Sequence, residues 1–145
     1  MSTNTSELNA ELRTAVARLY RRFRSERQDG ELGDAAVAVL VRLVRAGPQS
    51  LSALSEHEHV TPGSMSQTVN RLTAAGYAVR GKDPDDGRRV LFTVTPEGER
   101  LGTAIRERSL VWFDGELARF TDEQRRILHE AAVLLTTIAD SDGAA

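Results

Sequence analysis

The sequence predicts a mostly helical fold with one small β-hairpin, an α+β arrangement. Three observations predict it. Apolar residues recur at helical spacing over most of the chain, and Thr-Pro pairs at 61–62 and 95–96 provide strong helix starts. Between these pairs, Val90, Phe92 and Val94 alternate with other residues, as is typical of a strand. With 145 residues the chain can bury its own core, so we expect a single domain over 1–145.

Composition excludes several classes of function. The chain has no cysteine, which excludes disulfides, thiolate metal sites and cysteine-based redox sensing. His57 and His59 are two residues apart and would point to different faces of a helix, so we expect no metal. We also find no P-loop, nucleophile elbow or HExxH motif. We therefore expect neither an enzyme nor a cofactor.

Charge and hydropathy indicate where the protein works. No apolar run approaches a membrane span and no signal pattern opens the chain, so we expect a cytoplasmic protein without a membrane partner. The net charge of −2 argues against nonspecific coating of nucleic acid. The charge is uneven: residues 7–27 carry six Arg against three acids (+3), residues 50–95 carry five bases and five acids (0), and residues 96–145 carry six Arg against ten acids (−4).

The N-terminal part reads as two helices. Residues 6–27 place an apolar stripe on one face and arginines on the others, and Gly30 and Gly33 mark a break. Asp34 is expected to cap a second helix over 35–46, which ends at Gly47-Pro48.

The middle of the chain predicts a helix-turn-helix followed by a hairpin. Ser50 is placed to cap a short helix over 51–58, and Thr61-Pro62 starts another that runs to Ala75. Strand candidates at 77–82 and 90–95 flank a turn-forming stretch, DPDDGRR. A hairpin directly after a helix-turn-helix is a wing, so residues 35–95 are expected to form a winged helix-turn-helix.

The C-terminal part predicts two more helices, at 96–119 and, after a capping box at Thr121 and Gln124, at 122–139. The apolar stripes of helices 6–27 and 96–139 exceed what a small monomer can cover. We therefore expect these N- and C-terminal helices to form a homodimer, which would place two recognition helices about 34 Å apart on DNA.

The order of these elements resembles the MarR (multiple antibiotic resistance regulator) family of bacterial transcription factors. The most specific stretch is MSQTVNRLTAAGYAVRGKDPDDGRRVLFTVTPEG, residues 65–98. Its matching elements are, in order, Arg71-Leu72, Gly76, Arg80, the segment from Asp83 to Arg89, and Thr95 to Gly98, with Val94 in place of the family's Leu. The resemblance implies a homodimer whose wings straddle a pseudo-palindromic operator in double-stranded DNA.

The expected DNA contacts lie on the recognition helix and the wing. Short polar side chains at a helix N-terminus suit phosphates and base edges, and a wing-tip arginine suits a narrow minor groove. By resemblance, Arg88 is the groove reader and Arg89 a phosphate or buttress residue, while Asp86 is expected to hold one arginine in place. The predicted contacts are Thr61, Pro62, Ser64, Ser66, Gln67, Thr68, Arg71, Arg88 and Arg89.

Relatives in this family often respond to small aromatic or phenolic ligands. The residues expected to line such an effector pocket are Tyr20, Phe23, Trp112 and Phe113, although aromatics at helical spacing are more often plain core. The sequence thus favours a repressor that a ligand releases from DNA. Two alternatives keep the fold: a winged-helix module that binds protein, and a constitutive DNA binder without an effector.

Overall fold

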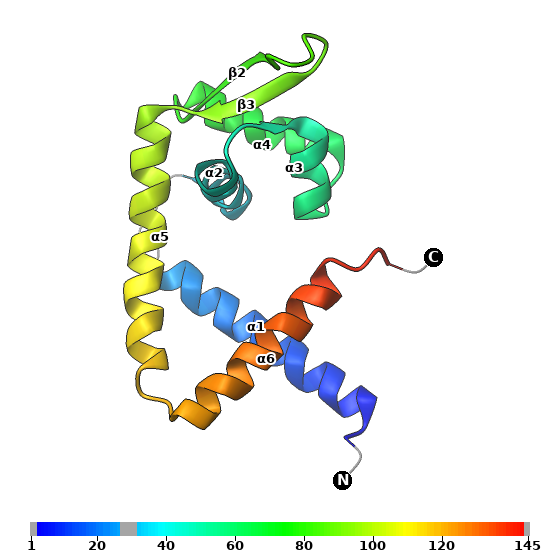
Figure 1. Ribbon diagram of the computed structural model, residues 1–145, viewed down its shortest axis with the longest axis vertical. Coiled ribbons are helices and arrows are strands. Elements are labelled where there is room, and N and C mark those ends of the chain that lie inside the picture. Colours follow the sequence, from blue (N-terminus) through cyan, green and yellow to red (C-terminus); the bar gives the residue numbers. More distant parts are fainter. Residues whose placement is uncertain (1–2, 27–31, 144–145) are drawn as a thin grey trace. The chain divides into compact units, whose positions relative to one another are not determined.

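The computed structural model describes residues 3–26 and 32–143. Within these ranges the chain forms six helices and three short strands (Figure 1). Their order is α1 (Thr5–Glu26), α2 (Asp34–Ala46), β1 (Gln49–Ser50), α3 (Leu51–Glu58), α4 (Pro62–Ala74), β2 (Ala78–Lys82), β3 (Val90–Val94), α5 (Pro96–Leu117) and α6 (Asp122–Ala139). Backbone contacts group the chain into two compact units, residues 1–109 and 110–145, and each is described by itself.

The mostly helical fold with a hairpin is confirmed, and each predicted helix and strand is present close to its expected bounds. The caps explain this agreement. The hydroxyl oxygens of Ser50, Thr61 and Thr121 accept backbone N–H groups at the starts of α3, α4 and α6, and Thr121 forms the predicted capping box with Gln124. Residue 27 of the first predicted helix and Gly30 lie outside the described residues.

The predicted cap of α2 was wrong. Asp34 is already inside the helix, and the N-cap is Gly33, which has no side chain to accept a hydrogen bond. The Asp34 carboxylate instead pairs with Arg24 of α1, with 2.8 Å between Oδ2 and Nε. A negative charge in the first turn interacts favourably with the positive end of the helix dipole. Asp34 therefore stabilises α2 by its charge rather than by capping it.

A third strand was missed from the sequence. β1 pairs antiparallel with β3, with Gln49 opposite Phe92 and Ser50 opposite Leu91, so the sheet order is β1-β3-β2. A strand of two residues is too short to show alternation, and only its pairing with β3 reveals it. β1 extends the hairpin into a sheet that begins right before α3.

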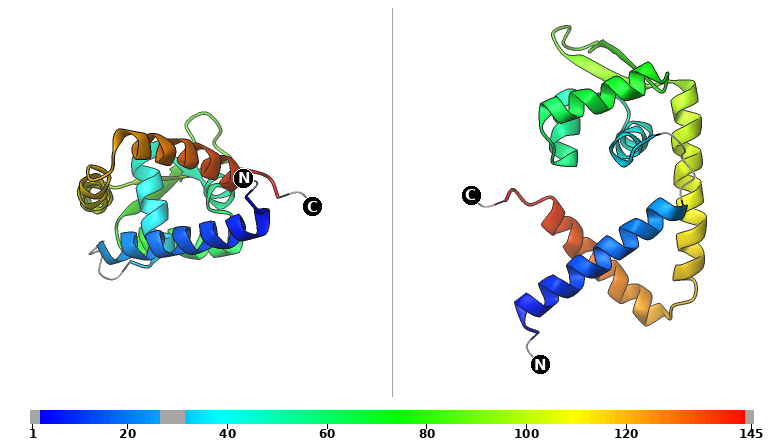
Figure 2. Two further views of the ribbon diagram at one scale, coloured as in Figure 1. Left: turned by 90° about the horizontal axis from the view of Figure 1, so that it is seen from below. Right: turned by 180° about the vertical axis from the view of Figure 1, so that it is seen from behind.

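The core lies between the sheet and helices α2, α3 and α4. Leu40, Leu54 and Leu72 are completely buried, and Met65 and Phe92 are at most 3% exposed. The loop between β2 and β3 projects beyond these helices (Figures 1 and 2). We call the segment from α2 to β3 the winged module.

Thr95 joins the end of α4 and the start of β2 to α5. Its N–H donates to the carbonyl of Tyr77 at 3.0 Å, its hydroxyl donates to the carbonyl of Gly76 at 2.6 Å, and the same oxygen accepts the N–H of Gly98 at 3.1 Å. Gly76 ends α4 with a φ of +83°, and the N–H of Tyr77 closes a Schellman motif on Leu72. We call this set of hydrogen bonds the Thr95 joint.

Two glycines let the first turns of α5 approach the winged module closely. A Cβ on Gly98 would lie 2.0 Å from the carbonyl oxygen of Tyr77, and a Cβ on Gly102 would lie 2.8 Å from Cγ2 of Val44 in α2. Both glycines are buried. Any side chain at residue 98 would therefore push α5 away from Tyr77, at the start of β2.

Outside this core the helices carry exposed apolar side chains. α1 and α6, all of whose residues are described, contain no buried residue. On α6, Leu134 is 65% and Ile138 is 64% exposed, and on α1 Val16 is 49% exposed. Across the described residues, no helix is long and apolar enough to cross a membrane.

Replacing Gly98 with alanine is expected to lower the free energy of unfolding by about 2–4 kcal/mol, because α5 must move away from the Tyr77 carbonyl. Gly115→Ala is the control: it lies in the same helix, and an added Cβ would meet no atom within 4 Å. We expect it to stabilise by about 0.5–1 kcal/mol. Urea unfolding at one fixed protein concentration measures both, and equal effects of the two substitutions would contradict the close contact.

Candidate functional site

The N-terminus of α4 is built by the predicted Thr-Pro pair. Oγ1 of Thr61 accepts the N–H of Ser64 at 3.2 Å, and Pro62 is the first helical residue. Both are exposed. Thr61 thus fixes where the helix begins, and its hydroxyl is already engaged in capping.

α4 has one buried and one exposed face. Met65, Val69 and Leu72 are buried in the core, four and three residues apart. The opposite side carries the exposed residues Ser64, Gln67, Asn70 and Arg71, which we call the recognition face. Asn70 was missed from the sequence, although its spacing of three residues from Gln67 places both on one side of a helix.

Two other predicted contacts lie at the edges of the recognition face. Ser66 and Thr68 are half-buried, and the hydroxyl of Thr68 donates to the carbonyl of Ser64 at 3.3 Å. The structure therefore divides the predicted residues of α4 into the exposed residues of the recognition face and two half-buried ones beside it.

Arg71 turns toward the start of α2. A Cβ on Gly33 would lie 3.3 Å from its Nη1, so the guanidinium rests against the N-cap of that helix. The sequence does not show this contact, because Gly33 and Arg71 are far apart in the chain. In this position Arg71 lies at the rim of the recognition face.

The wing is an antiparallel hairpin held by a compact loop. Arg80 is opposite Phe92 and Lys82 is opposite Val90. The guanidinium carbon of Arg80 lies 5.6 Å from the centroid of the Phe92 ring, which is a favourable cation–π arrangement. At the loop, the N–H of Asp83 donates to the carbonyl of Arg89 at 2.9 Å, which closes the hairpin.

Among the described residues, Asp86 does not hold an arginine side chain, contrary to expectation. Its Oδ1 accepts the backbone N–H of Arg88 at 3.1 Å, and its carbonyl accepts the N–H of Arg89 at 3.0 Å. A short carboxylate in a turn reaches the backbone two residues ahead more easily than a long side chain. The side chain of Arg89 lies near Asp83 instead, with 4.0 Å between Nε and Oδ2.

Arg88 differs from Arg89 in this respect. It is exposed at the end of the loop, and its guanidinium makes no ion pair with any residue that the structure describes. The loop thus fixes the backbone of Arg88 and leaves its charge available.

The four residues predicted to line an effector pocket are divided between the two units. Tyr20 and Phe23 lie on α1, where Tyr20 is 49% exposed. Trp112 and Phe113 lie on the last part of α5, in the second unit, with ring centroids 5.8 Å apart and 24° between the ring planes. A pocket formed by all four stays a prediction. Within residues 3–26 and 32–143, no group of three His, Asp or Glu is placed to hold a metal ion.

Comparison with known proteins identifies the family. The sequence model of the MarR family matches residues 31–89, from the segment before α2 to the wing loop. An uncharacterized HTH-type transcriptional regulator of Mycobacterium bovis is 31% identical over 140 residues, which cover 97% of this chain and 98% of that protein.

Solved structures show the same fold. The crystal structure of NadR in complex with 4-hydroxyphenylacetate has a TM-score of 0.77 and 26% identity, covering 98% of this chain and 100% of NadR. A MarR family protein from Bacillus stearothermophilus has a TM-score of 0.81 over 97% of this chain and 100% of its own, at 20% identity. The matching family model and a relative that is similar over nearly the whole chain identify the family. The chain belongs to the MarR family of DNA-binding transcriptional regulators.

Proposed function

We propose that the protein is a homodimeric repressor that binds a pseudo-palindromic operator and is released from it by a small aromatic or phenolic ligand. The observation that carries the DNA-binding part is the pairing of an exposed polar face on α4 with an uncommitted arginine at the tip of the wing. These two surfaces suit the major groove and the adjacent minor groove of double-stranded DNA.

The recognition face offers side chains that read bases. Gln67 and Asn70 each carry an amide that can pair with adenine through two hydrogen bonds in the major groove. Ser64 lies near the helix N-terminus, where backbone N–H groups favour phosphate, and Thr61 and Pro62 set that end in place. Ser66, Thr68 and Arg71 lie at the edges, so we assign them to neighbouring phosphates or bases rather than to the centre of the groove.

The wing arginines take different roles. Arg88 has no partner among the described residues and is the side chain we assign to the minor groove, where the negative potential is focused. Arg89, close to the carboxylate of Asp83, carries a partly compensated charge and suits a phosphate contact.

The proposed dimer is supported by the exposed apolar side chains of α1 and α6. A chain that leaves Leu134, Ile138 and Val16 about half exposed or more in solution needs a cover for them. A second copy is the commonest cover, because a two-fold interface uses the same surface on both subunits. We therefore keep the assignment of helices 6–27 and 96–139 to dimerisation, the winged helix-turn-helix to residues 35–95, and a single domain to 1–145.

Ligand release is supported by the likeness to NadR, whose crystal structure contains 4-hydroxyphenylacetate. A phenolic acid of this kind is the effector class we propose for this protein. Tyr20, Phe23, Trp112 and Phe113 remain the aromatic candidates for the pocket. The repressor assignment requires that ligand lowers the affinity for the operator.

Arg88→Ala is expected to weaken binding to the operator by about 1–3 kcal/mol, because a minor-groove contact is lost. The operator is first selected from genomic fragments with the purified protein, and the affinity is then measured by fluorescence anisotropy at fixed salt. Arg106→Ala, which removes an exposed arginine of α5, is the charge-matched control. Unchanged affinity of the Arg88 variant would contradict the wing assignment.

The same experiment separates the alternatives. If the selection yields no DNA, a protein-binding winged module is supported instead. If DNA is bound and 4-hydroxyphenylacetate and related phenols leave the affinity unchanged, a constitutive binder is supported.

Gln67→Ala and Asn70→Ala are expected to relax the preference for one operator base each, by about 1–3 kcal/mol at that base pair. Competition against single-base operator variants measures this preference. Asn9→Ala, an exposed change on α1, is the matched control and should leave every preference in place. A uniform loss across all operator variants would show that these amides contact the DNA backbone and not its bases.

A further inference from the structure

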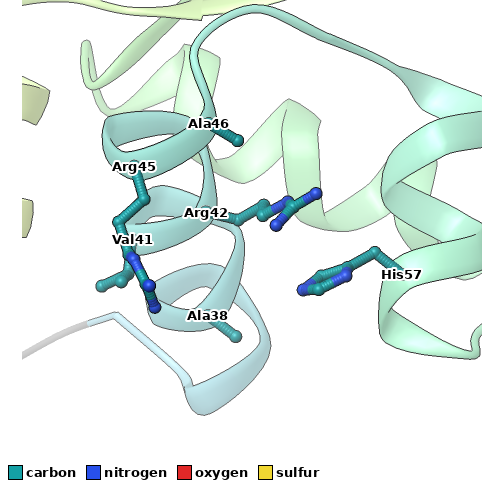
Figure 3. A pocket seen from close by; sticks show the side chains of 6 residues that line it. All are labelled: Ala38, Val41, Arg42, Arg45, Ala46 and His57. Atoms are coloured by element: carbon teal, nitrogen blue, oxygen red, sulfur yellow. The ribbon is translucent and has the colours of Figure 1, made fainter. Parts of the chain in front are cut away.

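A cavity lies between α2 and α3, on the winged module itself. It has a volume of about 280 Å³. Its lining residues come from α2 except for one from α3, and they are Ala38, Val41, Arg42, Arg45, Ala46 and His57 (Figure 3). A water molecule occupies about 30 Å³ in the liquid, so this space suits a molecule the size of one ring with a small polar group.

The polar lining of this cavity consists of nitrogen donors. Arg42 extends from α2 toward His57, and the imidazole of His57 points back from α3 (Figure 3). Arg45 also lines the cavity, and its side chain runs along α2 beside Val41 rather than toward His57 (Figure 3). The nearby carboxylate of Glu58 lies 4.0 Å from Nε2 of His57, beyond hydrogen-bond distance. Neither Arg42 nor Arg45 forms an ion pair within the described part of the chain.

One of these donors is buried without a partner. In the described part of the chain, Nε of Arg42 is the single buried side-chain nitrogen or oxygen that makes no hydrogen bond. A buried N–H left unpaired is costly, and on a guanidinium the cost is larger because the group is charged. Folded proteins usually pair such a group with another protein group, an ordered water or a bound ligand, so the site can accept a hydrogen-bond acceptor at this nitrogen.

We propose that this cavity binds a small organic carboxylate. The two carboxylate oxygens accept hydrogen bonds from Arg42 and from His57, while Arg45 adds a second positive charge at the rim. The methyl groups of Ala38, Val41 and Ala46 accommodate an apolar body, which a hydrated inorganic anion does not have. The ligand class is therefore an aliphatic or aromatic monocarboxylate.

The position of the cavity connects it to DNA binding. Its α3 wall packs against α4, the helix that carries the recognition face. None of the four aromatic residues predicted for the effector pocket lines it. An effect of the carboxylate on operator binding rests on the proposed function, in which a ligand releases the protein from DNA. Binding of the carboxylate to the cavity is measured on the protein alone.

Isothermal titration with benzoate at fixed ionic strength tests the proposal. Benzamide, its uncharged counterpart, and inorganic phosphate are titrated in parallel. We expect benzoate to bind the wild type, and Arg42→Met to weaken that binding at least about tenfold, because a charge-assisted pair is lost while the stem of the side chain remains. Arg45→Met should have a smaller effect in the same direction. Arg106→Met, which removes an exposed arginine of α5, should have none.

Folding and location are checked separately. Arg42→Met should keep a Tm equal to or above that of the wild type, because it removes the unpaired buried N–H. If this variant unfolds, amide chemical shifts of the wild type titrated with benzoate decide instead, and they should change on α2 and α3.

Four results would overturn the proposal: no binding of benzoate, equal binding of benzamide, tighter binding of phosphate than of benzoate, or benzoate-induced shifts confined to other elements. None of them depends on DNA. Failure of operator binding by the wild type would instead overturn the proposed function, so the two failures can be told apart.

Discussion

The Thr95 joint is the constraint on which the rest of the winged module depends. A single threonine binds the end of α4 through Gly76, the start of β2 through Tyr77, and the first turn of α5 through Gly98. Gly98 adds the steric condition, since a side chain there would collide with the Tyr77 carbonyl. The recognition helix, the wing and the first part of α5 are thereby fixed to one another.

This rigidity matters because the module has little net positive charge to attract DNA. Residues 50–95 carry five basic and five acidic side chains, and the whole chain has a net charge of −2. Affinity for DNA must then come from where a few groups are placed, and the dimer that we propose would add a second copy at a spacing that matches the DNA. The wing loop is built in the same way. Asp83 partly neutralises Arg89, while Asp86 binds only backbone N–H groups, and no described residue forms an ion pair with Arg88.

What the sequence predicted well was determined locally. The helix starts at Thr61-Pro62 and Thr121 depend on residues within one turn, and the hairpin depends on alternation and a turn composition, so both were visible in the sequence. The recognition face followed from helical spacing, apart from Asn70. The features that were missed depend on distant residues. β1 exists through pairing with β3, Arg71 rests against Gly33, and Arg42 of α2 points toward His57 of α3.

Native-state hydrogen exchange at two amides tests the rigidity of the joint most directly. The N–H of Thr95 donates to Tyr77, and the N–H of Gly98 donates to the Thr95 hydroxyl. If the joint opens only when the whole fold unfolds, both amides exchange with the free energy of global unfolding, like the core amides of Leu40 and Leu72. Exchange through a low-energy local opening, while those core amides stay protected, would contradict the account.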